Sequence, residues 1–192
     1  MSPFDERRFF ENDLGPVISK LAKSKGKIRL SRLIHWYQRL RNLAKAPSPR
    51  PFLFSDLKRE LLKEVGSDTP LLKRPAFQVA EDLYVKARFQ ELKEALLGTC
   101  YSLSSVARSP VRWGFSAGEA LTVTYSFRSS YEGFDLAGFC SKLVVSGGKS
   151  FDFDAGYPFL EAVVDGAGGQ CEWNWHGRRW ELTVAVPVHR IR

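Results

Sequence analysis

Ser116 is the first residue whose surroundings could do chemistry, because it lies in a Gly-x-Ser-x-Gly pattern. That spacing is typical of a nucleophile elbow, which needs a strand before the serine and a helix after it. Acids and histidines that could complete a hydrolase triad follow in chain order: Asp152, Asp165, His176 and His189. Pro110 shortly precedes the serine, and a strand-like alternation follows it. We therefore interpret the segment as a glycine-rich loop.

A second pattern, Ser-Gly-Gly-Lys-Ser over residues 146–150, is similar to the end of a phosphate-binding loop. The first glycine of that motif would fall on Leu143, and no helical pattern follows Ser150. Without a helix N-terminus, the backbone N–H groups are not directed at a phosphate. The pattern therefore predicts no nucleotide site.

Histidines and cysteines give no metal site by spacing, so none is predicted. His176 is expected in a turn, His189 in a basic tail, and His35 on the exposed side of a helix, where an imidazole could accept phosphate. The three cysteines are odd in number and widely spaced, which argues against a disulfide scaffold or a zinc site: Cys100, Cys140 and Cys171. No apolar run is long enough for a membrane helix, and the N-terminus lacks a secretory signal, so we expect a cytoplasmic protein.

The positive charge is concentrated at the start of the chain. Of the net charge of +8, all lies in residues 1–50, and the remaining 142 residues balance to zero. From Leu14 to Ser55 there are ten basic residues and no acid. Such a run predicts a surface for phosphates or for an acidic protein face.

The elements that would position these residues divide the chain at a proline-rich segment. Residues 1–46 show two helical patterns with one apolar stripe each, broken near Gly26. Two short helices cannot bury both stripes alone, so the stripes could dock on the second domain or pair with another copy. We predict a helical hairpin that pairs with a second copy in a four-helix bundle. Residues 47–52 carry prolines at alternate positions and are expected to be an extended linker.

Residues 53–192 are predicted to form an α+β sandwich with helices on one face of a mostly antiparallel sheet. The patterns indicate a helix capped by Ser55 and ending near Gly66, two short strands within 76–88, a helix over 89–103, a strand over 121–127, a helix over 158–164, and a hairpin of strands 171–175 and 180–186 that turns at His176 and Gly177.

The order and spacing of residues 53–188 resemble the ATP-binding domain of bacterial sensor histidine kinases. The segments that carry the resemblance are Phe54–Leu57, Val85–Leu97, Phe159–Val164, the Gly168-Gly169 pair and Val184–Val188. Before the linker, residues 12–17 resemble the phosphoacceptor motif of the dimerisation hairpin, including that of ChpT-type histidine phosphotransferases.

Departures from the family decide what the resemblance implies. The acceptor histidine would fall on Asn12, and the two asparagines that help to hold magnesium and nucleotide would fall on Gly98 and Ser102. The acidic glycine-rich motif that reads adenine should follow the strand around Val123, but residues 125–129 are Tyr-Ser-Phe-Arg-Ser. We therefore expect neither a nucleotide nor a metal cofactor.

We accordingly predict a non-catalytic, homodimeric relative of the histidine-kinase core that docks a response-regulator receiver domain or another signalling protein. The predicted contact residues are Asn12, Asp13, Lys20, Lys23, Arg32 and Arg39. Two alternatives stay open. One is a histidine phosphotransferase that uses His35 as phosphoacceptor, and the other is a nucleic-acid-binding regulator that uses the basic hairpin.

Overall fold

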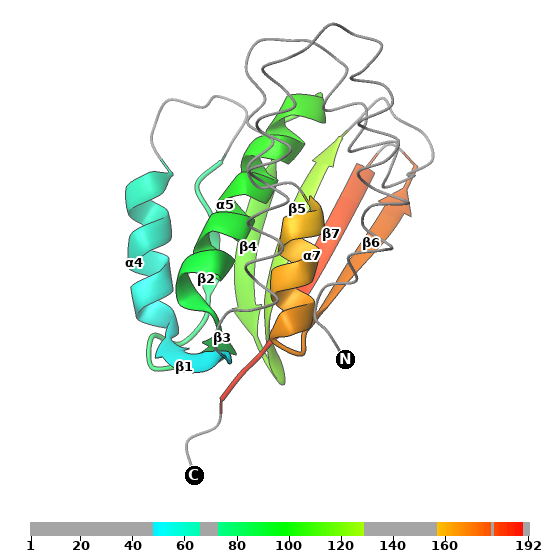
Figure 1. Cartoon of the computed structure of the whole chain (residues 1–192). Coiled ribbons are helices and arrows are strands. Elements are labelled where there is room, and N and C mark those ends of the chain that lie inside the picture. The colour runs from blue at the N-terminus through cyan, green and yellow to red at the C-terminus, as the bar shows by residue number, and fades with distance from the viewer. Residues whose placement is uncertain (1–47, 66–72, 129–156, 178, 190–192) are drawn as a thin grey trace, which may run out of the picture.

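The protein is described by a computed structural model over residues 48–65, 73–128, 157–177 and 179–189 (Figure 1). Within these ranges the helices are α4 (Phe54–Glu64), α5 (Phe89–Val106) and α7 (Tyr157–Gly166). The strands are β1 (Arg50–Leu53), β2 (Ala76–Gln78), β3 (Tyr84–Ala87), β4 (Arg112–Ala117), β5 (Ala120–Arg128), β6 (Gln170–His176) and β7 (Arg179–Pro187).

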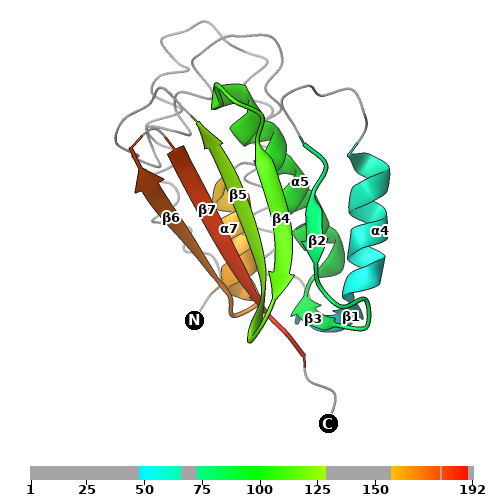
Figure 2. The same cartoon turned by 180° about the vertical axis from the view of Figure 1, so that it is seen from behind.

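Five strands form the main sheet in the order β2-β4-β5-β7-β6. β2 runs parallel to β4, and every other neighbouring pair in this sheet is antiparallel. α4, α5 and α7 cover one face, and none of these helices crosses the opposite face, which we call the open face (Figures 1 and 2). The described part of the chain is therefore the two-layer α+β sandwich that the sequence predicts.

Alternating residues of β5 and β7 build the core between the two layers. β5 buries Leu121, Val123, Tyr125 and Phe127, and β7 buries Trp180, Leu182, Val184 and Val186. α5 and α7 pack against them with Leu92, Leu96, Leu103, Phe159, Leu160 and Val164. Full burial of one such side chain stabilises the fold by about 1.5–3 kcal/mol. The alternate apolar residues of the strands and the apolar stripes of the helices therefore face each other across one core.

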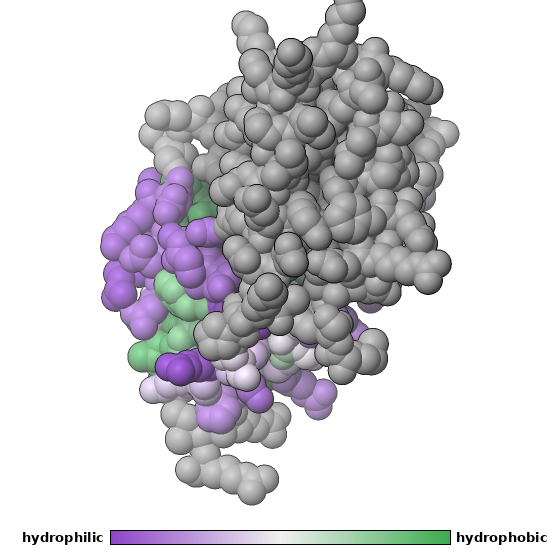
Figure 3. All heavy atoms as spheres, in the orientation of Figure 1, coloured by the Kyte–Doolittle hydropathy of each residue, from purple (hydrophilic) through white to green (hydrophobic). Residues whose placement is uncertain are grey.

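α4 covers the β2 edge of the sheet and shows a polar outer face (Figure 3). It buries Phe54, Leu57 and Leu61. Its outer residues form ion pairs, including Lys58 Nζ with Glu81 Oε1 at 2.7 Å and Lys63 Nζ with Glu60 Oε1 at 2.8 Å. Exposed pairs of this kind contribute little to stability, so this face is an ordinary solvated helix surface.

The second half of the predicted linker is a strand. β1 pairs antiparallel with β3, from Arg50 opposite Ala87 to Leu53 opposite Tyr84. The alternating prolines favour the extended backbone that a strand needs, and β1 attaches this part of the chain to the sandwich. The domain limits 1–46, 47–52 and 53–192 stay predictions.

Two local expectations were wrong. Ser55 makes no side-chain cap, because α4 already begins at Phe54, whose N–H donates to the carbonyl of Leu83 at 2.8 Å. The segment around Ser116 is not a loop but most of β4, which is paired along its length with β5. The predicted β6–β7 hairpin is confirmed, and its turn begins one residue later than expected, at Gly177 with φ of 65°.

The N-terminal helical hairpin and its four-helix bundle lie outside the described residues and stay predictions. Among the described helices, none combines the length and the apolar character that crossing a bilayer requires.

The Gly168-Gly169 pair closes α7 onto β7. Gly168 has φ of 80°, which glycine adopts without strain. A Cβ on Gly169 would lie 2.2 Å from the carbonyl oxygen of Ala185 and 2.8 Å from Cγ1 of Val164. The absence of a side chain at Gly169 is therefore what allows α7 to approach β7 closely.

We expect Gly169→Ala to lower the free energy of unfolding by about 2–3 kcal/mol, because overpacking of this kind must displace backbone. Urea unfolding followed by circular dichroism measures this loss. Gly118→Ala is the matched control, because a Cβ there meets no atom within 4 Å, and it should change stability by less than about 1 kcal/mol. Equal effects of the two substitutions would contradict the close approach.

Candidate functional site

The contact residues predicted for the hairpin lie outside the described residues, so the structure does not place them. They are Asn12, Asp13, Lys20, Lys23, Arg32 and Arg39, together with the alternative phosphoacceptor His35. The phosphate-loop-like segment 146–150 and Asp152 also lie outside.

The structure separates the residues of the hydrolase pattern. Ser116 pairs with Thr122, which pairs with Ala185, and Ala185 pairs with Gln170. Ser116 therefore lies level with the start of β6, whereas His176 is the last residue of that strand. A strand follows Ser116 instead of the helix that an elbow requires. No serine nucleophile site is assembled among these residues.

The described ranges also contain no group of three or more His, Cys, Asp or Glu side chains that could hold a metal ion. His176 ends β6 and His189 follows β7, and both are exposed. The N–H of His189 donates to the carbonyl of Tyr84 at 2.8 Å. These two histidines therefore lie in different parts of the fold.

The positions that the resemblance assigns to nucleotide binding lie on α5 and β5. Gly98 and Ser102 are one turn apart on α5. Tyr125 lies near the end of β5, three residues before Arg128. Gly98 is half-buried and has no side chain that could reach a ligand. β5 runs without interruption to Arg128 and stays paired with β7 as far as Arg179. Positions 125–128 are therefore regular strand.

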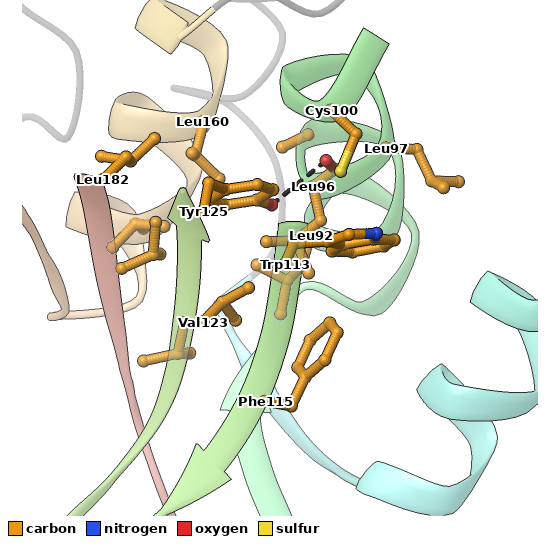
Figure 4. Packing of buried hydrophobic residues seen from close by; sticks show 14 of the residues in the cluster. Leu92, Leu96, Leu97, Cys100, Trp113, Phe115, Val123, Tyr125, Leu160 and Leu182 are labelled. Carbon is orange, nitrogen blue, oxygen red and sulfur yellow. Dashed lines mark hydrogen bonds between the residues drawn. The ribbon is translucent and has the colours of Figure 1, made fainter. Parts of the chain in front are cut away.

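Tyr125 fills the space between β5 and α5 (Figure 4). Its ring is fully buried, and its hydroxyl donates to the main-chain carbonyl of Leu96 at 3.1 Å. The ring of Trp113, its partner on β4, stacks on it with 5.8 Å between centroids and an angle of 7°. Leu160 of α7 and Cys100 of α5 lie close to the same ring in Figure 4. One aromatic side chain thus contacts both layers.

Every titratable group in this contact is kept neutral by burial. Burial raises the pKa of Tyr125 and of the Cys100 thiol well above their usual ranges. Burial, with the nearby carboxylates of Glu161 and Asp165, raises the pKa of Cys171 to about 12. A reactive thiol requires a lowered pKa and access to solvent. The Tyr125 contact therefore offers packing rather than a nucleophile or a base.

Further along β5, a second aromatic group continues the helix-facing side of the sheet. Phe127 lies opposite Trp180, and Trp180 lies opposite Trp175. The Trp175 and Trp180 rings have centroids 4.4 Å apart. Phe127 and Trp180 are buried, so the strand end is apolar on this side as well.

No family profile matches the chain, and no curated protein matches it. Solved histidine kinases do match by structure. AdeS of Acinetobacter baumannii has a TM-score of 0.59 at 12% identity, covering 97% of this chain and 87% of AdeS. The kinase domain of the E. coli osmosensor EnvZ has a TM-score of 0.52 at 12% identity, covering 77% of this chain and 94% of that domain. The ATP-binding domain of PrrB from Mycobacterium tuberculosis has a TM-score of 0.51 at 11% identity, covering 75% of this chain and 100% of that domain.

The fold is that of histidine-kinase ATP-binding domains. The resemblance drawn from the sequence is confirmed at this level, including the α+β class of the sandwich. Identities of 10–15% carry the fold alone and transfer no active-site residue.

The role of Tyr125 was not predicted from the sequence, although a signal for it was present. Tyr125 belongs to the buried set of β5 by alternation, and Leu96 and Cys100 belong to the buried face of α5 by helical spacing. Pairing these two faces would have placed the tyrosine against α5. Alternation alone could not predict that the Tyr125 hydroxyl donates a hydrogen bond to the main-chain carbonyl of Leu96.

We expect Tyr125→Phe to lower the free energy of unfolding at pH 7 by about 1 kcal/mol, because one buried hydrogen bond is lost. The difference should shrink in alkali. The folded-state pKa of Tyr125 lies above its unfolded value of about 10, so the stability of wild type falls as the pH rises through that value, whereas the stability of Tyr125→Phe has no such contribution to lose. Urea titrations at pH 7, 9 and 11 measure both effects. A difference that stays constant with pH would show that the hydroxyl is not buried.

Proposed function

We propose that this chain is a non-catalytic relative of the histidine-kinase core that works as a dimeric regulatory adaptor. In this proposal the sandwich binds no nucleotide, and the N-terminal hairpin docks a signalling partner such as a response-regulator receiver domain. The fold that the chain shares with AdeS and EnvZ is the reason to look to two-component signalling.

The observation that carries the proposal is the Tyr125 contact. According to the resemblance, an acidic glycine-rich segment that recognises adenine should begin near this position. Instead a neutral, buried ring stands there, hydrogen-bonded to Leu96 of the helix that should carry the magnesium ligands. The regular pairing of β5 as far as Arg128 also favours a strand over a glycine-rich turn.

The position of Gly98 supports the same proposal. Nucleotide-bound magnesium needs oxygen ligands, which side chains supply in phosphoryl-transfer sites. Gly98 supplies no such side chain, and Ser102 would offer a hydroxyl in place of an amide. A domain with these replacements retains the scaffold without the groups that handle phosphate.

Charge supports the choice of partner. The first 50 residues carry all of the net charge of +8, and receiver domains of this signalling class present an acidic phosphorylation pocket. Opposite charges accelerate and orient such encounters. Dimerisation would cover the apolar stripes that two short helices cannot bury alone.

We expect titration with a fluorescent ATP analogue and magnesium to show no saturable binding up to millimolar concentration. A catalytically active histidine-kinase domain serves as positive control in the same assay. Thermal unfolding with and without Mg-ATP gives an independent readout, because a ligand that binds only the folded state raises Tm. Micromolar binding, or a Tm shift of several degrees, would overturn the non-catalytic proposal.

We expect Asn12→His to gain an acid-labile label from a phosphorylated receiver domain, while wild type gains none. The substitution supplies an imidazole where the resemblance places the acceptor, so transfer would report that the partner docks in the kinase geometry. The double variant Asn12→His, His35→Ala should keep the label. Labelling of wild type that is lost in His35→Ala would instead support the phosphotransferase alternative.

A further inference from the structure

The open face of the sheet carries an arginine pair at the end of the two central strands. Arg128 of β5 and Arg179 of β7 lie directly opposite each other, and both are exposed. Their chain neighbours Phe127 and Trp180 are buried toward the helices, so alternation places the arginines on the other side of the sheet. Figure 2 shows this side, with the described helices behind it.

Hydrogen bonding and a third arginine define the surroundings of the pair. Arg179 Nε donates to Ser126 Oγ at 2.9 Å, which holds this guanidinium along the strand toward Arg112. Arg112 of β4 lies opposite Ser126 and is exposed on the same face. We call Arg112, Arg128 and Arg179 the arginine cluster. It spans three adjacent strands.

The free protein gains nothing from placing two of these charges opposite each other. Side chains directly opposite in an antiparallel pair have Cβ atoms about 5 Å apart, and like charges there are destabilising. Within the described ranges, no ion pair joins a member of the arginine cluster to an acid. The repulsion between Arg128 and Arg179 would be offset when carboxylates from another molecule approach.

The sheet beside the cluster is shaped for such an approach. Next to the arginine cluster, the open face carries small side chains. Gly114 lies opposite Thr124, and Thr124 lies opposite Thr183. Small residues leave the surface flat, so a second macromolecule can come close to the strands.

Acids on the same face indicate the chemical class of the partner. Glu181 lies opposite Ser126 and Asn174, and Glu172 lies opposite Thr183. These carboxylates would repel a uniformly negative polymer such as a nucleic acid. A protein surface with both signs of charge can instead match the arginines and the glutamates at once.

We propose that the arginine cluster is a docking surface for a partner protein that presents two neighbouring carboxylates to Arg128 and Arg179. A guanidinium binds a carboxylate through two parallel hydrogen bonds, which suits arginine better than lysine to this role. The surface involves no residue of the predicted hairpin, and it does not depend on whether the sandwich binds nucleotide. The inference is therefore independent of the proposed function.

The test uses the full chain, labelled with ¹⁵N, and a helical peptide whose glutamates repeat every four residues, a spacing that sets their Cβ atoms about 5–6 Å apart. We expect resonances of β5 and β7 near Arg128 and Arg179 to shift on titration. Site-resolved shifts separate this surface from the basic first 50 residues, which also attract the peptide. Arg128→Glu should weaken binding at the cluster at least tenfold.

Controls separate docking from charge and from folding. Arg50→Gln, Arg74→Gln removes the same amount of charge at exposed sites elsewhere, and should leave the shifts of β5 and β7 unchanged. Arg128→Glu should melt no lower than wild type, because it replaces a repulsive cross-strand pair with an attractive one. Unchanged binding of the glutamate peptide to Arg128→Glu would overturn the proposal. A single-stranded DNA oligonucleotide that binds at the cluster more tightly than the glutamate peptide would also overturn the proposal.

Discussion

The helical layer depends on a stripe of apolar side chains that β5 and β7 present to α5 and α7. Both central strands alternate a buried residue with a solvent-facing one over nine residues, and they pair along their whole length. A shift of one residue would turn every buried side chain to the open face, so the register has little freedom. Tyr125 extends this constraint into the helical layer by its hydrogen bond to Leu96. The arrangement of helices over the sheet follows from that register.

The same stripe limits the chemistry available inside the fold. A phosphoryl-transfer site needs charged ligands held in a polar cavity, whereas the described interior around Tyr125 holds aromatic rings, leucines and neutral thiols. Burial that favours packing also suppresses ionisation, as the raised pKa values of Tyr125, Cys100 and Cys171 show. The described core around Tyr125 therefore serves packing and stability.

Periodicity was enough to predict most of the sandwich. β5, β6, β7, α5 and α7 follow from alternation or helical spacing, because these elements face one core on one side. β4 was not predicted because Gly114, the following Gly118 and the nearby Pro110 are typical of loops, whereas pairing with β5 decides its structure. The start of α4 was misplaced for a similar reason. The N–H of Phe54, its first residue, donates to the carbonyl of Leu83. This contact comes from a distant segment, and no local capping pattern reveals it. The site residues on the hairpin lie outside the described ranges, so the structure tests none of them.

β3 has a consequence for how the sandwich can be connected to other chains. This short strand pairs with β1 at the beginning of the described sandwich, and Val85 also bridges Val188 near its end. The incoming and outgoing segments therefore meet at one place, beside the same four residues. Domains whose ends lie together are tolerated as insertions within a loop of a host protein. In this sandwich β3 contacts both β1 and the residue that follows β7, so a displacement of β3 would disturb both ends of the described sandwich.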